Sequence, residues 1–142
     1  MKIKNDKIDK VFSRLVRERA EWKCEAAGWN RVKCKVNLEC SHHIGRVKLG
    51  TRFLPDNAAC HCSAHHWHFT NNPLEHAEWV RFHIGADNYA ALRLHANQTH
   101  KLTNSDKERI YENLKGSLRA MEEERKENNR KGRIEFDSPY AF

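Results

Sequence analysis

The apolar residues near the start of the chain recur mostly three or four positions apart, which is the spacing of one face of a helix. They predict a helix over residues 7–23 that buries this face, which comprises Ile8, Val11, Phe12, Leu15, Val16 and Trp22. The rest of the helix surface is rich in basic residues, namely Lys10, Arg14, Arg17 and Arg19.

Further helices are predicted in the second half of the chain. Pro73 suits a first helical position and Gly85 suits a helix end, so residues 73–84 form one helix and residues 88–95 a shorter one. Ser105 and Glu108 have the spacing of a capping box at the start of a long helix. We interpret the apolar stripe of that helix as a packing seam, formed by Ile110, Leu114, Leu118 and Met121.

The middle of the chain has shorter elements. Gly28 and Asn30 interrupt the helical spacing, and a strand follows at about residues 37–44. A basic loop then leads to a second strand at about residues 57–62, which turns directly into a helix at His65. This order predicts a ββα core over about residues 37–72.

Length and composition suit one domain of modest size. The chain has 142 residues, of which 32% are charged, and its mean hydropathy of -0.91 leaves little apolar material for a second core. We therefore predict a single, mainly helical α+β domain over residues 1–127. Residues 128–142 are charged and then irregular, which predicts a flexible tail.

The charge balance favours a polyanionic partner. There are 26 Lys and Arg against 19 Asp and Glu, a formal net charge of +7, and a basic protein gains affinity for nucleic acid by releasing counterions. Arg46, Lys48 and Arg52 lie in the loop between the two predicted strands, where they are candidates for contacts to DNA phosphates. Simple solvation of these three side chains is the alternative.

The start of the chain carries no apolar run, so we expect neither a signal peptide nor a membrane span, and we expect the protein in the cytoplasm. Five cysteines, an odd number, argue against a disulfide framework. With ten histidines in the chain, metal ligation is the more natural use of the thiols.

Four of these residues can close a tetrahedral zinc site. Cys62 and His65 stand two residues apart where a strand meets a helix, and Cys24 and Cys34 bracket a loop. Four protein ligands of this kind make a zinc ion structural rather than catalytic. Cys40 and Cys60 are rival ligands, although both also suit a role as small buried hydrophobic residues.

A second group combines His42, His43, Asn57 and His66. Because neighbouring residues of a strand point to opposite faces, His42 and His43 are expected to serve different roles. Hydrolysis of a phosphodiester needs two such roles. One imidazole can hold a divalent cation against the phosphate, and another can take a proton from the attacking water.

The run from His42-His43-Ile44 through Asn57 to Cys62-x2-His65-His66 resembles the HNH (ββα-metal) endonuclease motif. The resemblance implies that His42 and His66 bind a catalytic Mg²⁺ or Mn²⁺, that His43 is the general base, and that Asn57 braces the loop between the strands. It also implies a structural zinc beside this site. The chain has His65 where the family more commonly has Cys.

Residues 39–127 are also similar to the phage NinG (Rap) recombination endonucleases, which implies branched DNA as the substrate and, for a phage protein, the host cytoplasm as its location. The motif Thr51-Arg52-Phe53-Leu54-Pro55-Asp56-Asn57 carries part of this similarity. Two other interpretations stay open: a homing or packaging-type nicking endonuclease, and a non-catalytic zinc module that binds DNA. A homodimer through the stripe of the last helix is a further possibility.

Overall fold

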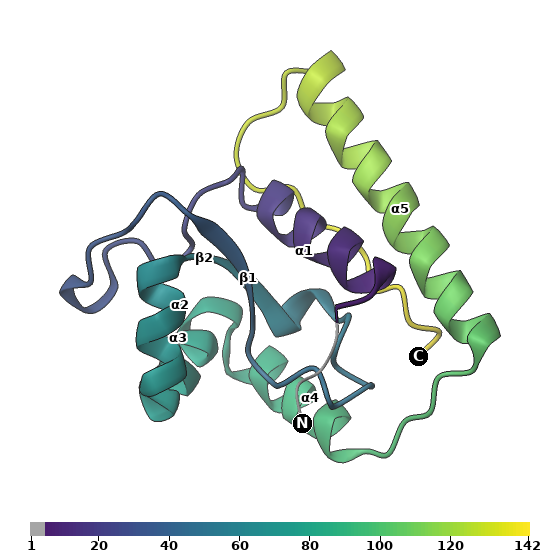
Figure 1. The fold of residues 1–142 in the computed structure, drawn as a ribbon, viewed down its shortest axis with the longest axis horizontal. Helices are drawn as coiled ribbons and strands as arrows, with labels where there is room; N and C mark the ends of the chain where they lie inside the picture. Colours follow the sequence, from purple (N-terminus) through teal and green to yellow (C-terminus); the bar gives the residue numbers. More distant parts are fainter. Residues whose placement is uncertain (1–4) are drawn as a thin grey trace.

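The computed structural model describes residues 5–142 and confirms the α+β class (Figure 1). The first four residues of the predicted domain lie outside the described part. Within that part the structure has five α-helices, two 3-10 turns and one antiparallel pair of strands. In chain order these elements are α1 (Lys7–Arg19), η1 (Trp29–Arg31), β1 (Leu38–His42), η2 (Pro55–Asn57), β2 (Ala58–Cys62), α2 (Ser63–Asn71), α3 (Pro73–Ile84), α4 (Ala86–Asn97) and α5 (Asn104–Glu127).

Helix α1 begins with capping hydrogen bonds that the spacing of apolar residues does not predict. The Asp6 side chain accepts hydrogen bonds from the first turn, and the Asp9 side chain accepts one from the Asp6 N–H, which together make a capping box. The helix ends at Arg19, four residues before the predicted end. Glu21 and Trp22 adopt positive φ angles of 56° and 54°, which a helix cannot continue through.

The two strands pair from Leu38 opposite Cys62 to His42 opposite Ala58. Ala58 belongs to a core shared with α1, whereas Ala59 packs with Phe69 of α2 and Trp79 of α3. The sheet therefore lies between α1 on one face and the α2–α3 pair on the other (Figure 1). With only two strands, each strand has one edge without a strand partner among the described residues.

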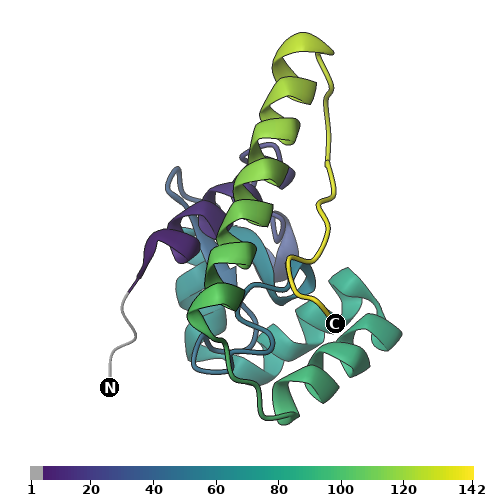
Figure 2. The same ribbon diagram turned by 90° about the vertical axis from the view of Figure 1, so that its right-hand side faces the viewer.

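Helix α5 packs against α1 (Figures 1 and 2). Ile110, Leu114 and Met121 are buried against the apolar face of α1, which confirms that the stripe is a packing seam. Because the seam is filled within one chain, it does not offer a dimer interface. The helix starts earlier than predicted, since Thr103 and Asp106 form the capping box instead of Ser105 and Glu108.

The prediction that residues 128–142 form a flexible tail is wrong. This segment runs back along α5 (Figure 2), and Ile134, Phe136 and Tyr140 are buried in the core between α1 and α5. The Tyr140 hydroxyl accepts a hydrogen bond from the Phe53 N–H at 3.0 Å. Three apolar side chains of this segment thus cover one side of the core. Their charged neighbours in the sequence make the segment resemble a solvent-exposed tail.

Among residues 5–142, none of the helices combines the length and the apolar character that a membrane span requires.

Candidate functional site

Cys24, Cys34, Cys62 and His65 come together as one group that could hold a metal ion. Their ligand atoms all lie within 4.8 Å of one another. The Nδ1 atom of His65 is 3.5 Å from Sγ of Cys24, 3.6 Å from that of Cys34 and 3.2 Å from that of Cys62. Ligand atoms on one tetrahedral zinc ion stand about 3.5 Å apart, so this Cys3His group suits a structural zinc.

The junction of β2 and α2 positions half of this group. Cys62 ends β2 and caps α2, and its Sγ accepts the His65 N–H at 3.4 Å. The Nε2 atom of His65 lies 3.4 Å from the carbonyl oxygen of Trp29. A carbonyl at this place favours the proton on Nε2 and leaves Nδ1 free to bind a metal.

The three thiols differ in how easily they ionise. Burial raises the pKa of Cys24 to about 12 and also raises the pKa of Cys34. Burial opposes the ionisation of Cys62 too, but hydrogen bonds from the backbone N–H groups of His65 and Lys35 lower its pKa to about 6. Cys62 is therefore the thiol of the group that ionises most readily.

The two remaining cysteines stand outside this group. Cys40 and Cys60 face each other across the strand pair. Burial raises the pKa of each to about 12. Cys60 is buried and Cys40 is half-buried, and neither belongs to the metal-binding group found within the described residues.

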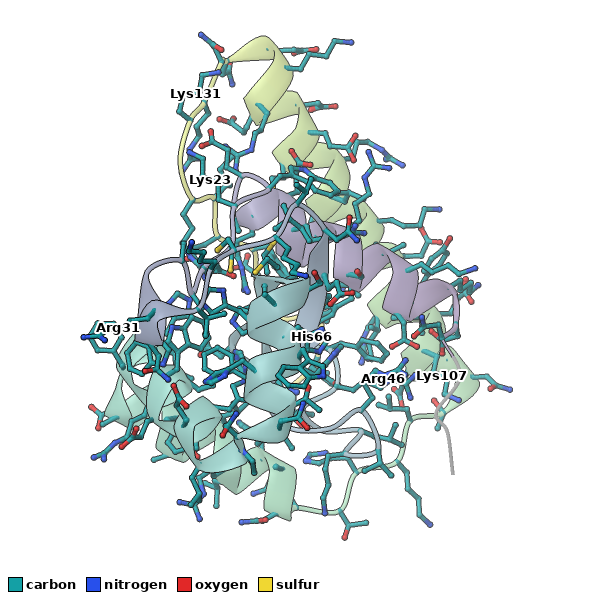
Figure 3. All side chains as sticks on the ribbon, turned by 60° about the vertical axis from the view of Figure 1, so that its left-hand side comes forward. Lys23, Arg31, Arg46, His66, Lys107 and Lys131 are labelled. Carbon is teal, nitrogen blue, oxygen red and sulfur yellow. The ribbon has the colours of Figure 1, made fainter. Side chains whose placement is uncertain are left out.

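His42 and His66 line a common groove at the edge of β1, between α1 and the first turn of α2. The groove has a volume of about 510 Å³. Figure 3 shows His66 on α2 and Arg46 on the loop after β1, on the same side of the molecule. Among the described residues, the lining comprises Asn5, Asp9, Lys10, Ser13, Arg17, Cys40, His42, Gly45, Arg46 and His66.

Each of these two histidines has one ring nitrogen next to an oxygen acceptor. Nε2 of His42 lies 3.0 Å from the carbonyl oxygen of Arg52, and Nδ1 of His66 lies 2.9 Å from Oε1 of Glu39. This arrangement leaves Nδ1 of His42 and Nε2 of His66 as the nitrogens that could bind an ion. Burial lowers the pKa of His42 to about 4, which keeps its ring neutral at physiological pH.

His43 lies on the other face of the sheet, as the alternation along β1 predicts. Its Nδ1 is 3.2 Å from Nε2 of His76, and its ring packs 5.9 Å from that of Trp79. Burial lowers the pKa of His43 well below its ordinary value. His43 lines a second cavity of about 310 Å³, whose charged neighbours are Lys48 and Arg93.

Asn57 is fully buried at the end of the loop between the strands. Its Oδ1 accepts the Ile44 N–H at 2.8 Å, and its Nδ2 donates to the carbonyl oxygens of Ile44 and Thr51, both at 2.9 Å. These three bonds join the two ends of the loop. They hold the segment that carries the histidines in a fixed position relative to β2.

The three residues predicted to contact DNA lie in different surroundings in the structure. Arg46 lines the groove, with its guanidinium 3.6 Å from Asp9. Lys48 is exposed beside the second cavity. Arg52 binds the Asp9 carboxylate at 3.0 Å with only 11% of its side chain exposed, so we reassign it from DNA contact to support of the groove.

Three residues that the site prediction left out lie beside the predicted histidines. Lys10 and Arg17 line the groove from α1, and His76 contacts His43 from α3. The basic face of α1 is the signal that could have identified the first two. No local motif links His76 to His43, because the two residues are 33 positions apart.

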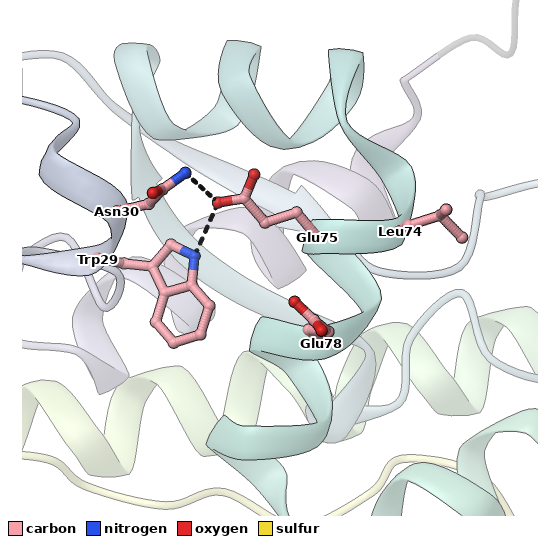
Figure 4. Close-up of a pocket in the computed structure, with 5 residues that line it drawn as sticks. All are labelled: Trp29, Asn30, Leu74, Glu75 and Glu78. Carbon is pink, nitrogen blue, oxygen red and sulfur yellow. Dashed lines mark hydrogen bonds between the residues drawn. The ribbon is translucent and has the colours of Figure 1, made fainter.

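A third cavity lies elsewhere, between η1 and α3 (Figure 4). It measures about 730 Å³ and is lined by Trp29, Asn30, Leu74, Glu75 and Glu78. Glu75 accepts hydrogen bonds from Trp29 Nε1, at 3.1 Å, and from Asn30. Two carboxylates make this cavity a poor site for DNA phosphates.

No protein-family model, curated protein or solved structure matches the chain. The resemblance to HNH endonucleases therefore depends on the motif residues and on their arrangement.

Proposed function

We propose that the chain is a metal-dependent DNA endonuclease of the HNH (ββα-metal) class. The observation that carries the proposal is that His42 and His66 line one groove, each with one ring nitrogen beside an oxygen acceptor. Histidines that bind metals commonly donate their other ring N–H to a carbonyl or a carboxylate. The same pattern is seen at His65 in the Cys3His group.

Two further observations support the proposal. The chain order β1, loop, β2 and α2, with Asn57 bonded across the loop, agrees with the motif that the sequence suggests. The groove also presents the basic side chains of Lys10, Arg17 and Arg46 beside His42 and His66. Cationic side chains of this kind contact the DNA backbone without reading its sequence.

In this mechanism His42 and His66 would hold Mg²⁺ or Mn²⁺. The bound ion supplies Lewis-acid stabilisation of the phosphate and of the departing 3′ oxygen. By the resemblance, His43 would take the proton of the attacking water, although its ring faces the second cavity and not the groove. Lys10 and Arg17 would hold the DNA backbone in the groove. The resemblance to recombination endonucleases makes branched DNA the proposed substrate.

A cleavage panel tests the proposal. Purified protein is incubated with linear, nicked, flapped and four-way DNA in the presence of Mg²⁺ or Mn²⁺. We expect His43→Ala and His66→Ala to lower the cleavage rate by at least about 100-fold. His68→Ala is the matched control, because His68 also lies on α2 but pairs with Glu75 at 2.9 Å and does not line the groove. Equal cutting by wild type and His66→Ala would exclude the metal assignment.

One observation favours a second function, a zinc module that binds DNA without cutting it. His43 lies on the opposite face of the sheet from the groove and contacts His76. The same panel separates the two functions. Tight binding with no cleavage of any DNA form would establish the module, whereas cutting that depends on His43 would exclude it.

A further inference from the structure

The third cavity, between η1 and α3, differs in charge from the two hollows beside the predicted histidines. The groove presents Lys10, Arg17 and Arg46, and the second cavity has Lys48 and Arg93. The third cavity has two glutamates and no lysine or arginine among its described lining residues. On a chain with a formal net charge of +7, this is a local reversal of sign. A ligand that complements this cavity is therefore positively charged.

The two glutamates of the third cavity have different surroundings (Figure 4). Oε1 of Glu75 accepts hydrogen bonds from Trp29 Nε1 and from Asn30, and its Oε2 lies 2.9 Å from Nε2 of His68. Desolvation would raise the pKa of Glu75, but the hydrogen bonds with His68 and Trp29 lower it, so this carboxyl is ionised at neutral pH. The Glu78 side chain is exposed, and its carboxylate makes no hydrogen bond or ion pair within residues 5–142. Glu75 thus ties η1 to α3, whereas Glu78 is available to a ligand.

Apolar side chains flank the available carboxylate. Leu74, Glu78 and Phe82 stand four positions apart on α3, so Glu78 lies between two apolar neighbours on one stripe of the helix. Leu74 is 86% exposed and Phe82 is 77% exposed, and the Phe82 ring lies 5.9 Å from that of Trp29. Together these residues form an exposed apolar surface with a carboxylate at its centre, which is the pattern of an interaction site.

The wall of the third cavity is fixed in place. The carbonyl oxygen of Trp29 lies 3.4 Å from Nε2 of His65, and the Trp29 indole N–H donates to Glu75. Both the backbone and the ring of Trp29 are therefore held by other elements. A site that is already formed binds its ligand at a lower entropic cost.

We propose that the third cavity and the Leu74–Glu78–Phe82 stripe bind a segment of a partner protein in which arginine or lysine stands beside large apolar residues. The cationic group pairs with Glu78 next to the Trp29 ring, and the apolar residues cover Leu74 and Phe82. A purely apolar segment would leave the Glu78 carboxylate desolvated and unpaired, and a purely cationic one would leave the apolar stripe exposed. The inference goes beyond the proposed nuclease function and does not depend on it.

A model peptide tests the charge of the ligand. A short fluorescent peptide of arginine and leucine in equal numbers is titrated with the zinc-loaded full chain, and anisotropy reports binding. We expect a Kd of roughly 10–100 µM, as suits a small contact, and no binding at about 1 mM when glutamate replaces arginine in the peptide. Failure of the arginine–leucine peptide to bind at about 1 mM would refute the inference.

Charge reversal on the protein separates the site from the field of the whole molecule. We expect Glu78→Lys to weaken binding of the peptide at least about 10-fold. Glu123→Lys is the matched control, because Glu123 is exposed on α5 and its reversal changes the net charge by the same amount. It should leave Kd within about twofold of wild type. Equal losses in the two variants would mean that the peptide responds only to net charge, and the proposed site would be wrong.

A second pair of variants tests the apolar half of the site. We expect Leu74→Ser to weaken binding at least about threefold, because the leucine side chains of the peptide lose an apolar surface to cover. Leu94→Ser is the control, since Leu94 is 62% exposed on α4 and does not line the third cavity. An unchanged Kd in Leu74→Ser would contradict the apolar contact.

NMR shows where the peptide binds. The indole Nε1–H signal of Trp29 should shift on addition of the peptide, whereas that of Trp22, whose Nε1 donates to Glu18 at 2.6 Å, should not. An unmoved Trp29 signal at saturation would place the peptide elsewhere and overturn the inference. Self-association that Glu78→Lys abolishes, without binding of the peptide, would assign the surface to a second copy of the chain and exclude the proposed partner.

Discussion

The Cys62 side chain has two structural roles, because its Sγ both caps α2 and belongs to the Cys3His group. We predict that Cys62→Ser loses the bound zinc, about one ion per chain, and that its free energy of unfolding falls by several kcal/mol, since the binding of a structural zinc is coupled to folding. Metal analysis and thermal unfolding measure both effects. Cys60→Ser is the control and should retain the zinc; a Cys62→Ser protein with full zinc content would contradict the assignment.

Asp9 shows how the polar residues beside the groove depend on one another. Burial alone would raise the pKa of its carboxyl, but the hydrogen bonds from Arg52 and from the Asp6 N–H lower it. Because the pKa is lower in the folded state than in the unfolded chain, ionised Asp9 stabilises the fold above its ordinary pKa of 3.8. This contribution is lost as the pH falls through the lowered value.

We therefore predict that Asp9→Asn lowers the free energy of unfolding at neutral pH by about 2–4 kcal/mol, since it leaves Arg52 without its carboxylate. The difference between wild type and variant should shrink as the pH falls below 3.8. Urea denaturation across this range measures the difference. Asp137→Asn, at an exposed position, is the control; a difference that stays constant with pH would contradict the role of the ionised carboxylate.

Among the elements, the C-terminal segment changes the description of the domain most. Ile134, Phe136 and Tyr140 complete the core between α1 and α5, and the Phe136 ring packs edge-on against Phe12 with centroids 6.2 Å apart. A boundary at Glu127, which the sequence suggests, would expose this core. The domain therefore extends beyond helix α5 and includes the C-terminal segment.

We predict that a chain ending at Glu127 is less stable than the full chain by well over about 5 kcal/mol, because removing one large buried side chain already costs about 3–5 kcal/mol. Circular dichroism during heating measures the loss. A chain ending at Ala141 is the control, since Phe142 is 55% exposed, and should unfold within a few degrees of the full chain. Equal stability of the two truncated chains would contradict the packing role of the segment.

In the whole molecule, the groove draws its charge from parts that are distant in the chain. Lys10 and Arg17 come from α1, Arg46 comes from the loop after β1, and all three meet beside His42 and His66. If this groove binds DNA as we propose, it does so mainly through phosphates. Its affinity should therefore fall steeply with salt.

We predict that Lys10→Ala/Arg17→Ala weakens binding to all DNA forms alike and lowers the salt slope of log Kd by about 0.9 for each phosphate that the protein no longer neutralises. Fluorescence anisotropy at several salt concentrations measures the slope. Lys115→Ala is the control, because Lys115 lies on α5 and pairs with Glu112 at 3.8 Å outside the groove. An unchanged slope in the double variant would place the DNA elsewhere.

The elements and the local residue pairs follow from the amino-acid sequence alone. Apolar spacing predicts α1, α3 and α5 because each helix must bury one face, whatever it packs against. Strand alternation separates His42 from His43, and the spacing of Cys62 and His65 places both at the junction of β2 and α2. These features involve residues within a few positions of one another, so the local backbone suffices to predict them.

Which distant residues meet depends instead on how the elements pack. The contact of His43 with His76, the closing of the core by Tyr140, and the burial of Arg19, which donates to the Pro55 carbonyl at 2.8 Å, all join positions more than 30 residues apart. On the sequence, Arg19 belongs to a solvated face and Tyr140 to a tail. Their burial follows from the way α1, the sheet and α5 come together in three dimensions, and residue spacing carries no information on such long-range packing.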